Sequence, residues 1–164
     1  MWLPNAHAQS WLLREYQIKA AFVYNFLKFI DWPSDALLET SDTVTICVLG
    51  HDAAAEAFET IRDKVVSGRR LVVQQIQAVR GLEACHVLFI TSSEERRLPQ
   101  VMQNLQRSSV LTVGEMESFI PSGGIINFVI ENNKVRFQIN STGATRARLK
   151  LSSHLLRLAT VVKQ

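Results

Sequence analysis

Basic side chains gather near the end of the chain, where they could bind an anion or an acidic partner. From Asn133 to Gln164 the sequence has seven basic residues and no acidic one. If one helix ran through this region, four side chains would share a face at three- and four-residue spacing. These four are Arg146, Lys150, His154 and Arg157. The pattern fits an anion site or an interface with an acidic partner, and it fits a solvated helix face as well.

Two cysteines offer a second kind of chemistry. Cys47 and Cys85 begin or lie within neighbouring predicted strands. They could approach to bridging distance if those strands are adjacent in the sheet. In a reducing compartment the same two residues would be buried thiols instead. The spacing leaves both interpretations open.

Residues for catalysis or metal binding form no pattern that points to an enzyme. The sequence has no nucleophile elbow, phosphate-binding loop, dinucleotide fingerprint or zinc-protease motif. Cys85 and His86 would point to opposite sides of a strand, which argues against a catalytic dyad. The acidic pair Glu94-Glu95 fits the first turn of a helix. His51 follows a predicted strand, where α/β folds bind ligands, although a polar loop cap is equally consistent. We therefore expect no enzyme, no metal and no cofactor.

Length and composition limit the class of protein. The chain has 164 residues, 47% of them hydrophobic, and a formal net charge of +3. That length suits one domain, and the small charge excess gives no argument for nucleic acid binding. No apolar stretch is long enough to cross a bilayer. Ala6-His7-Ala8 has the form of a signal-peptidase site, so we expect a leader over residues 1–8 and one domain over residues 9–164, unless the tripeptide is a coincidence.

Periodic apolar residues predict the elements that must position these side chains. Strands are expected at Thr43–Leu49, Leu71–Ile76, His86–Thr91, Val110–Val113, Ile125–Ile130 and Val135–Ile139. Helices are expected from Ser10 to Trp32, Asp52 to Lys64, Ser93 to Gln106, Asn140 or Ser141 to Arg148, and Ser152 or Ser153 to Val162. The junction between the last two helices is ambiguous. The order predicts a single layered α/β domain, with a mostly parallel sheet, an antiparallel C-terminal hairpin and flanking helices.

Several segments, taken in order, match the sequence blocks of one known family. The first is the block Lys19–Phe29, KAAFVYNFLKF, closed by Asp31-Trp32-Pro33. Similar blocks follow at Ile46–Gly50, Cys85–Ile90, Leu111–Gly114 with Gly123-Gly124, Val135–Asn140, Leu149–Ser153 and Leu155–Ala159. The first block is the most specific, because no generic amphipathic helix requires Tyr-Asn-Phe and a closing Trp-Pro. Taken together, these segments resemble the YfiR family, and the resemblance extends over nearly the whole chain.

This resemblance implies a periplasmic protein that is made with a signal peptide. Such a protein is a homodimeric repressor that binds the periplasmic part of an inner-membrane diguanylate cyclase. It lowers cyclic di-GMP synthesis and so restrains exopolysaccharide and biofilm formation. An outer-membrane lipoprotein of the OmpA type can draw the repressor away. The alternative is a periplasmic sensing domain for a small anion or nucleotide, with Arg146, Lys150, His154 and Arg157 as its binding residues.

The resemblance also bears on the two cysteines. Cys47 and Cys85 match cysteines of family members, which implies a Cys47–Cys85 bridge. Some members carry a second cysteine pair that this chain lacks. The resemblance therefore does not imply a redox switch of the same design in this protein.

Overall fold

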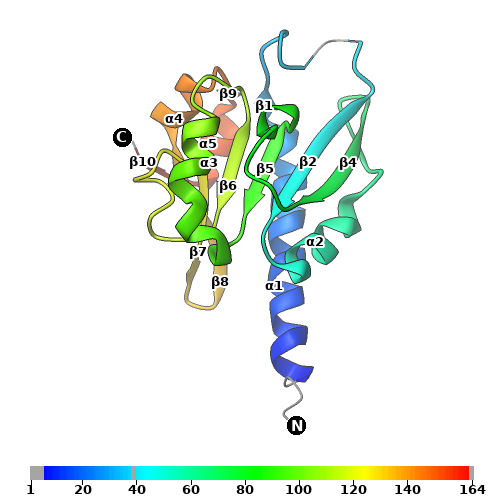
Figure 1. Ribbon diagram of the computed structural model, residues 1–164, viewed down its shortest axis with the longest axis vertical. Helices are drawn as coiled ribbons and strands as arrows, with labels where there is room; N and C mark the ends of the chain where they lie inside the picture. The colour runs from blue at the N-terminus through cyan, green and yellow to red at the C-terminus, as the bar shows by residue number, and fades with distance from the viewer. Residues whose placement is uncertain (1–5, 38–39, 163–164) are drawn as a thin grey trace.

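The computed structural model describes residues 6–37 and 40–162, and it is built around one eight-stranded sheet (Figure 1). The strands lie in the order β10-β8-β7-β6-β5-β2-β4-β3. Their bounds are β2 (Thr43–Leu49), β3 (Val65–Val66), β4 (Arg69–Ile76), β5 (Val87–Ile90), β6 (Leu111–Gly114), β7 (Ile126–Glu131), β8 (Lys134–Asn140) and β10 (Thr160–Val162). A two-stranded sheet pairs β1 (Ile30–Asp31) with β9 (Lys150–Leu151). The predicted α/β class is confirmed.

Strands β4, β2, β5, β6 and β7 are parallel neighbours, and β7 and β8 form the predicted antiparallel hairpin. Asn132 and Asn133 both have positive φ at the hairpin tip, which is the backbone geometry of a two-residue turn. Strand β10 returns to the edge of the sheet and runs parallel to β8.

Helices cover both faces of the sheet. Their bounds are α1 (Ala6–Leu27), α2 (Asp52–Phe58), α3 (Leu98–Asn104), α4 (Ser141–Arg146) and α5 (Ser153–Leu158). Alternate residues of β2 serve the two faces: Ile46 and Val48 join the core with α1 and α2, whereas Cys47 and Leu49 join the core with α3. A strand that is buried on both faces needs the near-continuous apolar run that β2 has.

The direction in which the chain adds strands to the sheet reverses after β4, so the switch point of the strand order lies between β2 and β5. The chain passes from β2 to β4 on one side, and then returns to β5, β6 and β7 on the other. In open α/β sheets, ligand sites occur outside the carboxyl ends of the strands at such a reversal. In this fold, the segments that start at Gly50 and Thr91 meet there.

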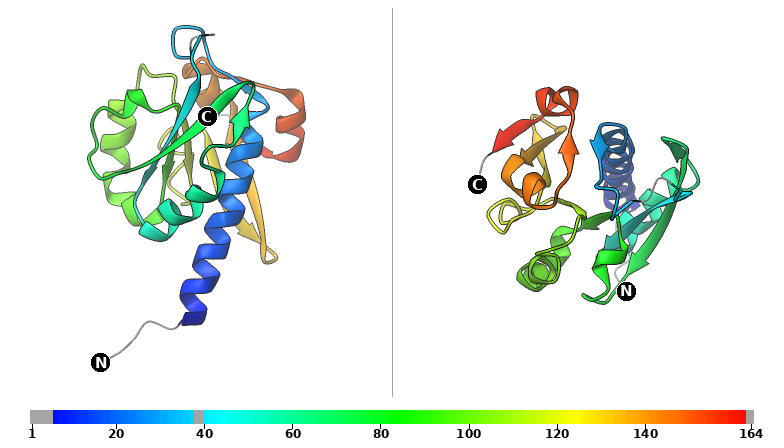
Figure 2. Two further views of the ribbon diagram at one scale, coloured as in Figure 1. Left: turned by 90° about the vertical axis from the view of Figure 1, so that its right-hand side faces the viewer. Right: turned by 90° about the horizontal axis from the view of Figure 1, so that it is seen from above.

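Helix α1 runs along one face of the sheet and projects past the carboxyl ends of the strands (Figures 1 and 2). It begins at Ala6, so the expectation that Ser10 starts the helix is wrong. It also ends at Leu27 rather than Trp32, because Ile30 pairs with Leu151 in the small sheet. The predicted leader over residues 1–8 lies partly outside the described residues, and it stays a prediction.

Three further helix predictions need correction. The helix expected over Asp52–Lys64 ends at Phe58, and Val65 lies in β3 instead of on the helix. The helix expected over Ser93–Gln106 is a 3-10 segment, η3 (Ser92–Arg97), followed by α3. The last predicted helix stops at Leu158, and residues 160–162 form β10 because they pair with β8.

Candidate functional site

A cluster of polar side chains lies at the carboxyl ends of β5 and β6, beside α1. Glu115, the residue after β6, accepts hydrogen bonds from the Tyr16 hydroxyl at 2.7 Å and from Lys19 Nζ at 2.7 Å. The backbone N–H of Ser92 donates to the same carboxylate at 2.9 Å. Lys19 also pairs with Glu15, at 2.9 Å. We call Glu15, Tyr16, Lys19 and Glu115 the carboxyl-edge cluster.

The charged groups of this cluster are largely shielded from solvent. The side chains of Lys19 and Glu115 are 4% and 6% exposed. The Lys19 ammonium also lies near the rings of Tyr16 and Phe128, 5.3 and 5.9 Å from their centroids. Burial, followed by the charge of Glu115, raises the pKa of Tyr16. The phenol therefore stays protonated and donates a hydrogen bond to the carboxylate. The cluster therefore fastens α1 to the ends of two strands.

A groove opens next to the cluster, between α1 and the β7–β8 hairpin, with a volume of about 610 Å³. We call it the carboxyl-edge groove. Leu12 and Glu15 line its α1 side, and Val129 and Ile130 line its hairpin side. Residues that follow the strands also line it, namely His51, Ser92, Glu115, Met116 and Glu117. It occupies the position at which this class of sheet binds ligands.

The loop after β2 is held tightly at this edge. The backbone N–H of His51 donates to the Thr91 hydroxyl at 3.2 Å, and that hydroxyl bonds Ser93 Oγ at 2.7 Å. Gly50 has a φ of +125°, and a Cβ there would meet Thr91 Oγ1 at 1.8 Å. Only glycine fits such a close approach. His51 itself is exposed at the rim of the carboxyl-edge groove, near the ligand position that the sequence indicated.

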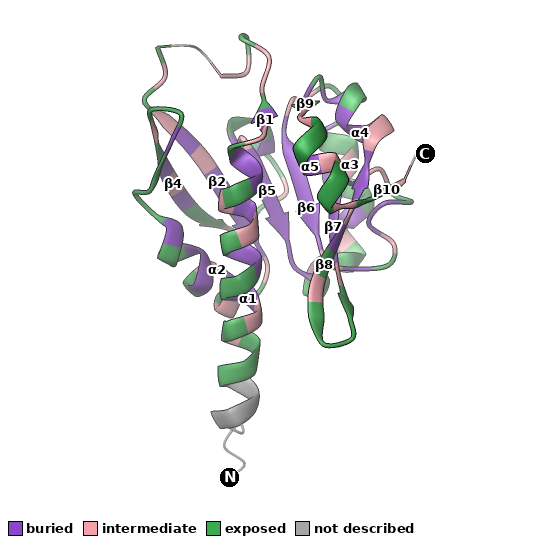
Figure 3. Ribbon diagram, turned by 180° about the vertical axis from the view of Figure 1, so that it is seen from behind, coloured by how far each residue is buried: buried purple, intermediate pink, exposed green. Residues whose placement is uncertain are grey.

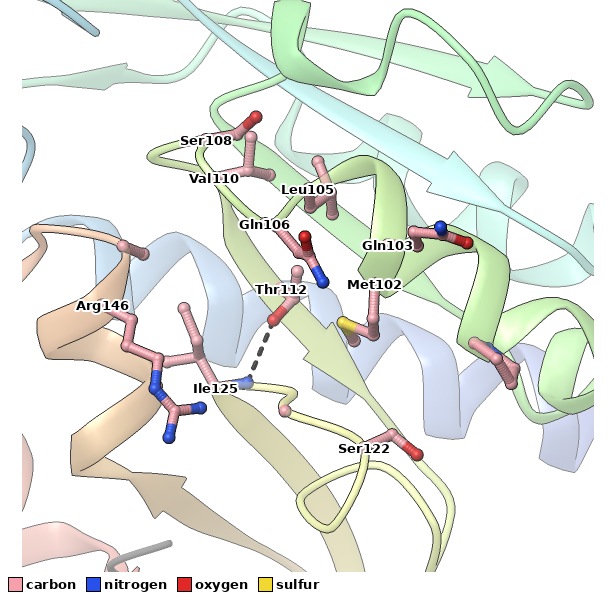
Figure 4. Close-up of a pocket in the computed structure, with 14 residues that line it drawn as sticks. Met102, Gln103, Leu105, Gln106, Ser108, Val110, Thr112, Ser122, Ile125 and Arg146 are labelled. Carbon is pink, nitrogen blue, oxygen red and sulfur yellow. Dashed lines mark hydrogen bonds between the residues drawn. The ribbon is translucent and has the colours of Figure 1, made fainter.

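A second cavity, of about 540 Å³, lies between α3 and α4, over β6 and the start of β7 (Figure 4). Met102 and Leu105 approach it from the α3 side and Arg146 from α4. Ile125, which precedes β7, donates its backbone N–H to the Thr112 hydroxyl at 3.0 Å on the floor. We call this space the α3–α4 cavity. Its apolar floor, its hydroxyl groups and one guanidinium suit a small molecule with an acidic group.

The four residues predicted to form a basic face do not share one. Helix α4 ends at Arg146, and Arg148 has a φ of 60°, which ends the helical geometry. Lys150 follows in β9, and Ser152 then caps a separate helix by accepting from the N–H of Leu155. The condition on which a shared basic face depended, one helix running through this region, is therefore not met.

Each of these four side chains has different surroundings. Arg146 lines the α3–α4 cavity, whereas Lys150 is exposed in the small sheet. The ring of His154 lies 4.7 Å from that of Phe29, and Arg157 is exposed on α5. Their predicted role in binding stays a prediction, and Arg146 alone lines one of the two cavities above.

Sequence reasoning missed the carboxyl-edge cluster. Tyr16 and Lys19 stand three residues apart on a helix, but their spacing gives no sign of the third partner. Glu115 lies 96 residues from Lys19 along the chain and in an unremarkable loop. Its position after a buried strand was the only available signal.

Cys47 and Cys85 form a disulfide, with their Cα atoms 5.9 Å apart. The bridge joins β2 to the residue two before β5, its neighbour in the sheet. The adjacent His86 faces β2, where its Nδ1 accepts the backbone N–H of Thr45 at 2.9 Å. Burial lowers the pKa of His86, against the opposing effect of a hydrogen bond to the backbone of Ala36. Cys85 therefore carries no free thiol for a dyad with His86.

Over 6–37 and 40–162, no group of three or more His, Cys, Asp or Glu side chains is placed to hold a metal ion. Within the same ranges, none of the helices combines the length and apolar character needed to span a membrane.

These observations define an open α/β domain with a disulfide, an α1 helix held against the strand ends by the carboxyl-edge cluster, and the two cavities described above. The chain belongs to the YfiR/HmsC-like family, whose family model matches residues 16–160. This family is regulatory and non-catalytic, and it is periplasmic. No curated protein matches the chain significantly.

Two solved structures share the fold. A conserved domain protein from Vibrio cholerae is 14% identical, with a TM-score of 0.58 over 79% of this chain and 57% of that one. The ABC domain from Streptococcus pneumoniae, solved in complex with L-Trp, is 12% identical, with a TM-score of 0.52 and the same two coverages. This chain thus spans little more than half the length of either, and at these identities the likeness concerns the fold alone.

Proposed function

We propose that this protein is a periplasmic negative regulator that binds the periplasmic part of an inner-membrane diguanylate cyclase. By doing so it lowers cyclic di-GMP synthesis and restrains exopolysaccharide and biofilm formation. Membership of the YfiR/HmsC-like family over residues 16–160 is the observation that carries this proposal. The protein would act by binding its partner, and not by turning over a substrate.

The chemistry of the fold supports this role in two ways. A disulfide persists in an oxidising compartment such as the periplasm, and Cys47–Cys85 is buried beside β2. The ionisable groups of the carboxyl-edge cluster are engaged with one another, which is what holding a helix requires. A regulator needs a rigid surface to present, and these bonds supply rigidity.

The same proposal includes two further partners. We expect the chain to form a homodimer, and we expect an OmpA-type outer-membrane lipoprotein to compete with the cyclase for it. Size-exclusion chromatography with light scattering measures the first directly. Addition of the purified lipoprotein to a preformed regulator–cyclase complex measures the second, and release of the regulator is the expected result.

The deciding experiment is a pull-down of the detergent-solubilised cyclase encoded beside this gene, with cyclic di-GMP measured in cells. We expect retention of the cyclase on the immobilised protein, and lower cyclic di-GMP when the protein is expressed. Charge reversal at Arg146 and at Arg157, two exposed basic residues on separate helices, then maps the surface. Failure to bind under both oxidising and reducing conditions overturns the proposal.

A second candidate function rests on the α3–α4 cavity. Its volume of about 540 Å³ and its single charged lining residue, Arg146, favour a small molecule with an anionic group. In this function the protein senses the ligand and signals through a partner. Isothermal titration with small carboxylates and nucleotides tests it, with Arg146→Ala as the variant that should lose binding. Equal affinity of the wild type and Arg146→Ala would exclude this cavity as the site.

A further inference from the structure

Apolar side chains remain uncovered around the carboxyl-edge groove. Trp11, Leu12 and Ile18 on α1 are 69%, 38% and 48% exposed, and Ile130 at the end of β7 is 52% exposed. Leu12 and Ile130 line the groove from opposite sides. Single exposed apolar residues are ordinary on a protein surface. Several around one concave opening indicate an interaction site.

The exposed apolar residues of α1 belong to a stripe along the helix, and the rest of the protein packs on this stripe further towards the carboxyl end of α1. Trp11, Glu15, Ile18 and Phe22 follow one another at four- and three-residue spacing, so they share one side of the helix. Phe22 is partly covered, because its ring lies 5.9 Å from the rings of Phe128 and Phe137. Towards its amino end, α1 projects past the sheet beside the tip of the hairpin, and both are exposed there (Figure 3). The stripe therefore extends beyond the surface that this chain covers.

The groove is also acidic, although the chain as a whole carries a net charge of +3. Its charged lining residues are Glu15, Lys19, Glu115 and Glu117. The single ammonium, on Lys19, is already bound by Glu15 and Glu115. Glu117 is exposed, and it forms no ion pair with any residue in the described ranges. An occupant that complements this groove carries basic side chains next to apolar ones.

We propose that the carboxyl-edge groove docks a basic, apolar segment of the periplasmic part of the partner cyclase. This inference rests on the proposed function and adds the surface and the chemistry of the partner. An apolar side chain of the segment inserts between Leu12 and Ile130, and neighbouring residues cover Trp11 and Ile18. A lysine or arginine of the segment pairs with Glu117. Tryptophan is enriched among the few residues that dominate binding energy at such interfaces.

A second copy of the chain is a poorer occupant. A two-fold symmetric dimer through this groove would place the same patch on both subunits. Glu117 of each copy would then approach an equally acidic surface, and like charges in contact oppose association. The negative charge of the groove thus favours a foreign, basic segment.

The test compares two pairs of substitutions in otherwise intact protein. Trp11→Ser with Ile18→Ser removes the exposed stripe of α1. Leu158→Ser with Val161→Ser removes two similarly exposed residues, 63% and 43%, on α5 and β10. Calorimetry measures binding to the purified periplasmic domain of the cyclase encoded beside this gene. We expect the first pair to weaken binding roughly 30-fold or more and the second by less than about 3-fold.

Glu117→Lys gives an independent result that does not depend on the apolar residues. We expect it to slow association and to remove much of the salt dependence of the association rate, because exposed rim charges act mainly on association. Its folding is checked by the thermal melt, which should match that of the wild type. If the Trp11 and Ile18 pair melts early, the Glu117 variant decides the question.

The outcomes separate this inference from the function on which it rests. If the wild type does not bind the cyclase domain, the proposed function fails. If the wild type binds and the Trp11 and Ile18 pair and Glu117→Lys bind equally well, the function stands and the docking surface is refuted. If light scattering shows instead that the Trp11 and Ile18 pair dissociates a dimer of the free chain, the groove is a contact between copies, and the inference is overturned.

Discussion

Replacing both members of the buried Lys19–Glu115 pair should destabilise the fold by less than the sum of the two single replacements. The two side chains are 4% and 6% exposed, and 2.7 Å separates Nζ from Oε1. Removing one partner of such a pair leaves the other buried charge unbalanced, at a cost of about 3–5 kcal/mol. Lys19→Met should lie in this range. Glu115→Gln should cost somewhat less, because Glu15 still pairs with Lys19.

In the double variant both charges are absent, and the amide oxygen introduced by Glu115→Gln can still accept the hydrogen bonds from Tyr16 and from the N–H of Ser92. The loss of stability in the double variant should therefore fall short of the sum of the single losses by roughly 2 kcal/mol. For a domain of this size, each kcal/mol lowers the melting temperature by about 2–4 °C. Urea unfolding of all four proteins, followed by circular dichroism, measures the difference.

The exposed ion pair between Arg70 and Asp63 is the control, because its side chains are 55% and 61% exposed. The same cycle there should give less than about 1 kcal/mol of coupling. If the Lys19 and Glu115 substitutions add to within about 0.5 kcal/mol, α1 is not fastened by this pair, and our account of the carboxyl-edge cluster is wrong.

Three further predictions concern other parts of the fold. Reducing the Cys47–Cys85 disulfide, which spans 38 residues, should lower the free energy of unfolding by about 4 kcal/mol on the chain-entropy estimate, as urea titrations with and without reductant would reveal. Gly124→Ala should lower the melting temperature by several degrees, since its Cβ would lie 2.3 Å from the Phe119 ring; an unchanged melt would contradict this. His86 has a pKa below its usual value of 6.5, so the unfolded chain takes up its proton first and stability should fall as the pH drops below that value. Thermal melts at pH 7.5 and 5.5 test this, and His86→Asn should reduce the difference between them.

Local sequence signals were enough for the main elements of the sheet. The β-branched run at Thr43–Leu49 and the apolar run at Val87–Ile90 are strands because they are buried on both faces. The predicted hairpin closes through Asn132 and Asn133, whose residue type tolerates the positive φ that both adopt. In these places, local preference and tertiary burial favour the same structure.

The tail could not be predicted in the same way, because distant pairing decides its structure. Lys150 and Leu151 are drawn into a strand by Asp31 and Ile30, which the sequence assigned to a helix. Because of that pairing, the four basic residues do not lie on one face of a helix. Likewise, no local pattern connects Lys19 to Glu115, because the fold alone brings the carboxyl end of β6 to α1.

The order of the elements along the chain affects how the protein can fold as it emerges from a ribosome or a translocation pore. Among the elements described here, helix α1 emerges first, but the phenylalanine rings that pack on Phe26, at positions 128 and 137, emerge about a hundred residues later. A helix with such late partners gains little stability alone, and its apolar side chains stay open to other chains. Productive folding must therefore wait until the β7–β8 hairpin has emerged, and a chaperone that shields α1 during this interval should raise the yield of native protein.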